Sequence, residues 1–343
     1  MNELELHIDL ARKAVKPFGY DPEKPLAPQR EAILKKYTEL LGMPAVAGNA
    51  IPVVEQTETG DSRFDEIRFH YESEPGLNVP GHLLLPKGRK PGEKLSVVIC
   101  LQGHSTGMHI SLGRAKYEGD EETVSGGDRD FALQIVAHGY AAVAIEQRGM
   151  GEQKAPSWAP GAAMCHQAAL PAFAVGRTLI GERAFDISRL IDALPKFAGL
   201  GLPFDISLDT DRIGLMGNSG GGTATYHTAC VEPRIKVAMP SCAFNTYTDS
   251  IISMHHCSCN FIPGIVQYME MPDLAMMIAP RPLVIVSGQE DVIFPIAAVN
   301  EGFEKVKKIY AAAGAPDNCR LVVGPEGHRF YAALAWPVFE EFI

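Results

Sequence analysis

The stretch Gly214 to Thr223, GLMGNSGGGT, decides how the rest of the chain is interpreted. Within it, Ser219 stands between Gly217 and the three glycines 220–222, directly behind an apolar run. Glycine is costly inside regular structure, because it loses more backbone freedom on folding than any other residue. The cluster therefore predicts a sharp turn in which larger side chains would collide.

Around this turn, short apolar runs alternate with stretches of helical periodicity. A pair of strands is expected at residues 66–88, and further strands at 95–103, 141–151, 211–218, 235–243, 281–288 and 319–327. Helices are expected at 131–140, 182–196 and 223–233. This alternation predicts an α/β fold, with a mostly parallel central sheet and helices on both faces.

The first part of the chain has a different pattern. Residues 1–60 carry apolar residues at helical spacing between several prolines, which predicts an N-terminal helical arm. Residues 61–343 contain no repeat or linker that would divide them, so they are expected to form one catalytic domain.

The composition narrows the choice of partners. The formal net charge of the 343 residues is −10, which argues against nucleic acid and anionic membranes as partners. The N-terminus lacks a signal-peptide pattern, and the seven cysteines are irregularly spaced, which favours reduced thiols in the cytoplasm. The oligomeric state stays open, a homo-oligomer included.

Residues 217–221 match the pattern G-x-S-x-G, which is typical of a strand-to-helix turn that exposes a nucleophilic serine. The glycines let neighbouring elements pass close to the turn and leave backbone N–H groups at the start of the helix. A phosphate-binding loop is excluded, because no Lys-Ser or Lys-Thr pair closes the glycine run.

A nucleophilic serine needs a base, and the base needs an orienting acid. Asp291 follows the glycine that ends one expected strand, and His328 lies in the loop after the next strand. The order Ser219, Asp291, His328 is the order expected in this type of fold. Weaker candidates for the acid are Glu290, Glu326 and Asp273. For the oxyanion hole we expect the backbone N–H groups of Gly220 and His104.

These motifs resemble a known group of enzymes. LQGHSTGMH, IEQRGMGEQ, DRIGLMGNSGGG, APRPLVIVSGQEDVIFP and GHRF are similar to the bacterial α/β-hydrolases of the acetyl xylan esterase and dienelactone hydrolase-like group. Dienelactone hydrolases proper carry cysteine at the turn, where this chain has Ser219. The resemblance implies a Ser–His–Asp triad, no cofactor, and a carboxylesterase that often releases acetyl groups from sugars.

The sequence thus predicts a serine ester hydrolase that forms an acyl-enzyme on short-acyl esters, with an acetylated sugar as one candidate substrate. A serine peptidase of the prolyl-oligopeptidase kind is an alternative, although no propeller domain precedes the hydrolase part. A binding protein on an inactive hydrolase fold is the other alternative.

Further residues are candidates for the substrate site. Arg148 follows an expected strand and either binds substrate or braces loops, and Trp158 lies in an insertion where it could serve as a sugar platform. His256 belongs to the bulky residues expected around the acyl pocket. The adjacent HHCSC motif (255–259) lacks a matching second ligand pair, so we expect a packed pocket wall and no metal.

Overall fold

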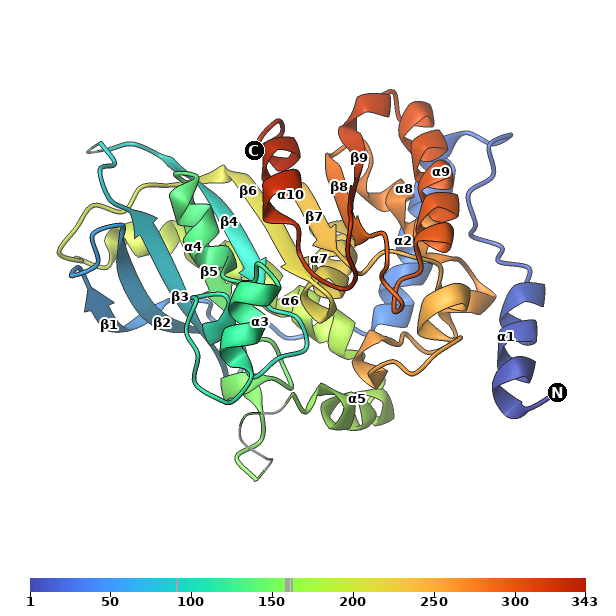
Figure 1. Ribbon diagram of the computed structural model, residues 1–343, viewed down its shortest axis with the longest axis horizontal. Coiled ribbons are helices and arrows are strands. Elements are labelled where there is room, and N and C mark those ends of the chain that lie inside the picture. Colours follow the sequence, from blue (N-terminus) through green and yellow to red (C-terminus); the bar gives the residue numbers. More distant parts are fainter. Residues whose placement is uncertain (91, 158–160, 162) are drawn as a thin grey trace.

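The structure is a computed structural model, which describes residues 1–90, 92–157, 161 and 163–343 (Figure 1). In this part of the chain, a nine-stranded sheet has the order β1-β2-β3-β5-β4-β6-β7-β8-β9. The strands are β1 (Val53–Glu58), β2 (Phe64–Glu74), β3 (Leu77–Pro86), β4 (Leu95–Leu101), β5 (Ala141–Ile145), β6 (Leu208–Asn218), β7 (Ile235–Ser241), β8 (Leu283–Gly288) and β9 (Cys319–Gly324).

The sheet has two parts with different strand directions. From β5 to β9 the neighbouring strands are parallel, whereas β1, β2, β3 and β5 pair antiparallel. In the register, Asn218 lies opposite Ser241, and Gly288 lies opposite Gly324. The carboxyl ends of the parallel strands therefore meet at one edge of the sheet, where ligands bind in folds of this type.

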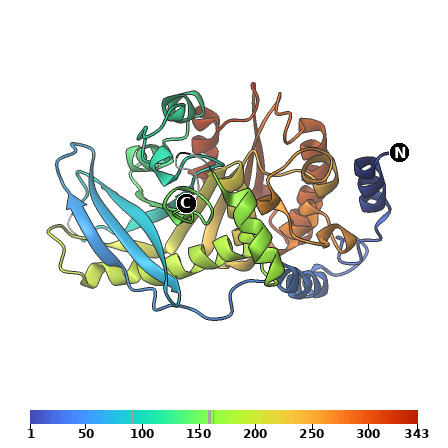
Figure 2. The ribbon, with the colours of Figure 1, turned by 90° about the horizontal axis from the view of Figure 1, so that it is seen from below.

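Helices cover both faces of the sheet, as predicted (Figures 1 and 2). They are α1 (Glu3–Lys13), α2 (Leu26–Leu41), α3 (Asp120–Gly126), α4 (Phe131–Ala137), α5 (Cys165–Ala174), α6 (Leu179–Ala193), α7 (Gly220–Val231), α8 (Ala275–Ile278), α9 (Ile296–Ala312) and α10 (Ala332–Phe339). No helix among the described residues combines the length and apolar character that crossing a membrane requires.

The continuous apolar strands contribute side chains to two separate hydrophobic cores, because successive side chains of a strand point to opposite faces of the sheet. In β4, Val97 and Ile99 pack with residues of α2, α6, α7, α8 and α9. Val98 and Cys100 of the same strand pack with α4 and α10 on the other face. A strand covered on both sides has no polar alternation, which explains the near-continuous apolar run in the sequence.

The N-terminal arm is helical only in its first part. It contains α1 and α2, and Tyr37 of α2 is buried against His227 of α7. Residues 53–58, which the sequence placed in the arm, form β1 instead, the antiparallel edge strand of the sheet. The pairing of β1 with β2 is interrupted by a bulge at Glu55. Polar residues dominate this strand, so its short alternation gave no strand signal.

Candidate active site

Ser219 occupies the turn between β6 and α7. Its backbone has φ 56° and ψ −123°, which lies in a region that residues with a side chain rarely adopt. The turn is held by the backbone N–H of Ser219, which donates to the carbonyl oxygen of Ser241 at 2.8 Å. Such local strain is common at functional sites, where it aims one side chain. The strained turn agrees with the expected nucleophile position.

Close packing explains two of the surrounding glycines. A Cβ atom on Gly221 would lie 2.1 Å from the carbonyl oxygen of Leu101 at the end of β4. A Cβ atom on Gly220 would lie 2.8 Å from the imidazole ring of His104. Neither distance leaves room for a methyl group, so glycine at these positions lets α7 start directly beside the loop after β4.

Asp291 and His328 form a hydrogen-bonded pair beyond the ends of β8 and β9. Nδ1 of His328 lies 2.8 Å from Oδ2 of Asp291. Oδ1 of Asp291 accepts hydrogen bonds from the backbone N–H groups of Ile293 at 2.8 Å and Phe294 at 3.1 Å. Burial raises the pKa of Asp291, but the hydrogen bond and charge of His328 and these backbone donors outweigh it, so the pKa is lowered.

Asp291 therefore remains ionised and fixes the imidazole of His328. The pair uses Nδ1 of His328 and leaves Nε2 of the ring outside it, and Nε2 is the atom that a general base uses. The ring of Phe294 stacks on His328 with a centroid distance of 5.9 Å and limits its rotation.

Short links connect Ser219 with this pair. Ser219 is bonded to Ser241, and the next residue, Cys242, donates its backbone N–H to Val286 of β8 at 2.8 Å. The thiol of Cys242 lies within 4.8 Å of the ligand atoms of Asp291 and His328. Ser219, Asp291 and His328 follow the carboxyl ends of the parallel strands β6, β8 and β9, so the predicted nucleophile, acid and base lie at the same edge of the sheet.

The three alternative acids have other environments. Glu290 is exposed, and Glu326 pairs with Arg329 at 3.0 Å. Asp273 is buried and binds Lys305 at 2.9 Å and the backbone N–H of Tyr20 at 3.0 Å. None of the three is hydrogen-bonded to His328 in the part of the chain that the structure describes, which leaves Asp291 as its partner.

The loop after β4 carries His104 and is tied to the loop after β5. Gln102 donates to the buried Glu146 at 2.6 Å, and Gln147 donates to the carbonyl oxygen of Gln102 at 2.6 Å. Burial raises the pKa of Glu146 to about 7, although backbone N–H groups, including that of Met108, stabilise its charged form. These bonds hold the expected oxyanion loop against Gly220.

The remaining predicted substrate residues have mixed positions. Arg148 is buried and bonded to Asp186 at 2.7 and 2.8 Å and to Glu74 at 2.8 Å, so its guanidinium braces loops through carboxylates. Nε2 of His256 lies 3.0 Å from the hydroxyl of Ser250.

His256 lies close to the Asp291–His328 pair. Its ring packs edge-on against Phe294 with a centroid distance of 5.5 Å, and Phe294 stacks on His328. Burial lowers the pKa of His256 to about 4, so the ring is neutral. A neutral ring in this position, close to His328, is suited to form part of the wall of a pocket. Trp158 lies outside the described residues.

The structure brings together a group of residues that the sequence did not connect. Side-chain ligand atoms of His104, Cys165, Cys257 and Cys259 all lie within 4.8 Å of one another. His255, which the HHCSC motif offered for the same face, is exposed and lies outside this group. The two cysteines of the motif thus meet His104, from the loop after β4, and Cys165, the first residue of α5.

Arg129 is a further residue that sequence reasoning missed. One of its terminal nitrogens donates to the backbone carbonyl of His328 at 3.3 Å. The other lies 3.7 Å from the position that a Cβ atom on Gly103 would take, and this position is 3.1 Å from Cβ of Ser219. Arg129 follows a Gly-Gly-Asp loop without any motif, so only the fold could reveal it.

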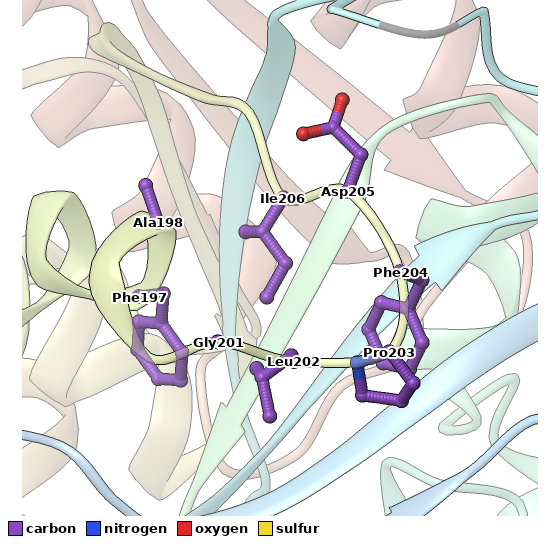
Figure 3. A pocket seen from close by; sticks show the side chains of 8 residues that line it. All are labelled: Phe197, Ala198, Gly201, Leu202, Pro203, Phe204, Asp205 and Ile206. Atoms are coloured by element: carbon purple, nitrogen blue, oxygen red, sulfur yellow. The ribbon is translucent and has the colours of Figure 1, made fainter.

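Among the cavities that the described residues form, two of similar volume lie at opposite ends of the strands. One, of about 420 Å³, is lined by residues of the loops after β4 and β5, among them Thr106, His109, Lys116, Tyr117, Glu146 and Glu152. The other, of about 380 Å³, is lined by Phe197, Ala198 and residues 201–206, before β6 (Figure 3). Since β6 begins at Leu208, this second cavity lies at the amino ends of the strands, away from Ser219.

The chain is similar in sequence to a bacterial protein. It is 24% identical over 232 residues to "Putative hydrolase YtaP" of Bacillus subtilis (strain 168), covering 66% of this chain and 71% of that protein. No family model matches the chain.

Among solved structures, a "putative acetyl xylan esterase" from Bacteroides fragilis NCTC 9343 has a TM-score of 0.73 at 15% identity, covering 94% of this chain and 82% of that one. A glucuronoyl esterase from Solibacter usitatus has a TM-score of 0.65 at 14% identity, covering 96% and 97%. An acetyl xylan esterase from Paenibacillus sp. R4 has a TM-score of 0.61 at 17% identity, covering 98% and 99%.

These similarities and the strand order confirm the predicted class: the protein has an α/β-hydrolase fold. Within that class, it shares its fold with acetyl xylan esterases and glucuronoyl esterases.

Proposed function

We propose that this protein is a serine ester hydrolase that acts through an acyl-enzyme. The observation that carries the proposal is the strained Ser219 turn at the same sheet edge as the Asp291–His328 pair. Hydrolase and esterase relatives on this fold support it. The alternatives are a serine peptidase and an inactive binding protein, and they differ in measurable reactivity.

In the proposed reaction, Oγ of Ser219 attacks the ester carbonyl carbon while Nε2 of His328 takes the hydroxyl proton. The backbone N–H groups of Gly220 and His104 stabilise the oxyanion. His328 then returns the proton to the leaving alkoxide, and the alcohol departs. Water, activated by His328, attacks the acyl-enzyme and releases the carboxylic acid and free Ser219.

We assign a positioning role to Arg129. Its hydrogen bond to the carbonyl of His328 holds the loop that carries the base, and its positive charge lies near Ser219. Arg148 is left out of the proposed substrate site, because its guanidinium is already paired with Asp186 and Glu74.

The alcohol part of the substrate is proposed to bind in the cavity between the loops after β4 and β5. Its lining offers hydroxyl, imidazole, ammonium and carboxylate groups. Such groups form hydrogen bonds with several hydroxyls at once, which suits a sugar ester better than a lipid. An acetylated carbohydrate is therefore the proposed substrate class.

A covalent probe tests the enzyme class directly. A fluorophosphonate is expected to label the wild-type protein on Ser219, as mapped by mass spectrometry of the labelled peptide, because it reacts with activated serines. Absence of labelling would favour the inactive binding protein. Labelling together with faster cleavage of peptides than of aryl esters would favour the peptidase.

Acyl-chain length tests the proposed pocket. We expect p-nitrophenyl acetate to have a higher kcat/KM than the octanoate, because bulky His104, His256 and Phe294 crowd the catalytic edge. An open apolar channel would instead gain about 0.8 kcal/mol for each methylene. A kcat/KM that climbs from two to eight carbons would contradict the short-acyl assignment.

We also propose a cytoplasmic location, on the basis of the thiols. All seven cysteines are unpaired. Closely spaced thiols such as those of Cys165 and Cys257 persist where glutathione and thioredoxin keep proteins reduced.

A further inference from the structure

Four potential metal ligands from three distant segments meet beside the catalytic turn. Cys165 is the first residue of α5, and Cys257 and Cys259 lie at and within the short helix η5 (Ser258–Asn260). His104 comes from the loop after β4. Nε2 of His104 lies 3.0 Å from Sγ of Cys259, and the sulfurs of Cys165 and Cys257 are 3.3 Å apart.

We propose that these residues form a structural zinc site with a Cys3His ligand set. Three thiolates and one imidazole are a ligand combination typical of structural zinc. With Zn–S near 2.3 Å and Zn–N near 2.05 Å, a tetrahedral site has ligand–ligand edges of about 3.6 to 3.8 Å. The His104–Cys259 and Cys165–Cys257 pairs need to separate by about 0.5 Å to reach these edges, and the other ligand atoms already lie within 4.8 Å of one another.

Burial supports metal binding over a set of free thiols. Cys165 and Cys259 are 2% and 0% exposed. A free thiol is only a weak hydrogen-bond donor and acceptor, so three thiols gathered around one imidazole gain little from one another. A metal ion in the centre would give each of them a strong bond and would explain why they converge.

Arg183 places a positive charge beside the four proposed ligands. Its guanidinium is buried, with Nη1 3.7 Å from Sγ of Cys259 and Nη2 donating to the carbonyl of Arg148 at 2.8 Å. Among the described residues, no carboxylate pairs with Arg183. A buried cation needs a compensating anion. A zinc ion with three thiolates and a neutral imidazole carries one net negative charge, which Arg183 would balance.

The proposed site is closed, because four protein ligands complete a tetrahedron and leave no position for substrate or water. Its role is therefore structural. It would fasten the loop of His104 to α5 and η5, and so fix the backbone N–H of His104 near Gly220. When Zn²⁺ binds, the three thiols lose three protons to solvent, and no bond to the substrate is involved.

The first experiment measures metal in the full-length protein, expressed with zinc in the medium and purified without chelator. Elemental analysis is expected to find about one zinc ion per chain. After exchange for Co²⁺, the protein should show thiolate-to-cobalt charge transfer and the visible bands of tetrahedral cobalt. A metal-free protein without these bands would overturn the proposal.

Matched variants locate the metal. Cys257→Ser is expected to lose its zinc to a competing chelator that the wild-type protein resists, and to melt at a lower temperature. Cys319→Ser alters a buried cysteine outside the group and should keep the metal. Cys257→His retains a ligand at the position, so it should bind Co²⁺ with a changed spectrum even if Cys257→Ser folds poorly. Equal zinc retention in Cys257→Ser and the wild type would contradict the assignment.

Two further measurements distinguish a zinc site from a catalytic metal and from a disulfide. Ser219→Ala should keep its zinc, since the metal site does not depend on the proposed esterase activity. A disulfide between Cys165 and Cys257 would make the intact protein lighter by two hydrogens and leave it unable to bind zinc. That result would replace the metal site with a redox-sensitive pair.

Discussion

At the scale of the residue, Ser219 combines an unusual backbone conformation with a backbone hydrogen bond to Ser241. Its positive φ is maintained by the packing of α7 against β4 and by the bond to Ser241. A backbone held in this way fixes the position of Cβ of Ser219 before substrate binds, which lowers the entropy cost of bringing its hydroxyl to a substrate. In the proposed reaction, this strain is part of the function of the turn.

Ser219→Ala is expected to lower kcat for aryl esters by about 10⁶-fold, because the attacking oxygen is removed. The melting temperature should stay close to that of the wild type, since the alanine has the same backbone requirement. Ser253→Ala should keep full activity, because this serine lies after the helix η4 (Tyr247–Ile251) and outside the proposed site. More than about a tenth of wild-type activity in Ser219→Ala would exclude Ser219 as the nucleophile.

Local motifs in the sequence point to some of these residues and not to others. Ser219, Asp291 and His328 could be proposed from the sequence because each lies in a local motif after an apolar strand, and the fold class supplies their order. His104 and Cys165 were not connected with Cys257 and Cys259, because no local pattern relates residues that far apart. Their convergence depends on how the loop after β4, helix α5 and helix η5 pack together, and the periodicity of the sequence does not encode this packing.

At the scale of the element, the contact between α7 and β4 is set by a close backbone approach. The strands of the parallel part and helices α4, α6 and α7 were predicted, since each is an apolar segment or has helical periodicity, whereas α9 was not among the expected helices. β1 was missed, because its residues are exposed or half-buried and the strand is held by pairing with β2, so it has no buried apolar face that a sequence pattern could reveal.

Gly221→Ala tests this close approach. Alanine is intrinsically better than glycine in a helix by about 1 kcal/mol, so propensity alone predicts stabilisation. The added methyl group would lie 2.1 Å from the carbonyl oxygen of Leu101. We therefore expect the free energy of unfolding to fall by at least about 2 kcal/mol.

Chemical denaturation of both variants supplies the comparison. In Gly60→Ala the new methyl group meets no atom within 4 Å, so its stability should stay within about 0.5 kcal/mol of the wild type. A stabilised Gly221→Ala would show that helix propensity outweighs the contact, and that the spacing between α7 and β4 is adjustable.

At the scale of the whole molecule, the arm and the catalytic part are joined by a buried polar contact. The hydroxyl of Tyr37 bonds Nδ1 of His227, and both side chains are almost fully buried. Burial lowers the pKa of His227 to about 3. The ring is thus neutral in the folded protein, whereas in the unfolded chain it takes up a proton near pH 6.5.

This difference predicts loss of stability in acid. Between pH 6.5 and 3 the unfolded state binds more protons than the folded state, so stability is full above about pH 6.5 and falls as the pH drops. From pH 6.5 to 4 the loss from His227 is on the order of 3 kcal/mol. His227→Gln should flatten this part of the stability profile, as measured by urea denaturation at each pH.

His7→Gln on the exposed α1 provides the control and should follow the wild-type profile. If His227→Gln and the wild type lost stability in parallel down to pH 4, the buried imidazole would not be the group that takes up the proton.

The edge strand β1 has a consequence for the behaviour of the protein at high concentration. An unpaired strand edge can recruit another chain and begin aggregation. Here the bulge at Glu55 interrupts the ladder, and the carboxylates of Glu55 and Glu58 stand along the exposed strand. Glu55 is in turn held by Arg68 at 3.0 Å and His70 at 2.7 Å. A second chain approaching this edge would meet an irregular, negatively charged strand, so the sheet ends here instead of growing from molecule to molecule.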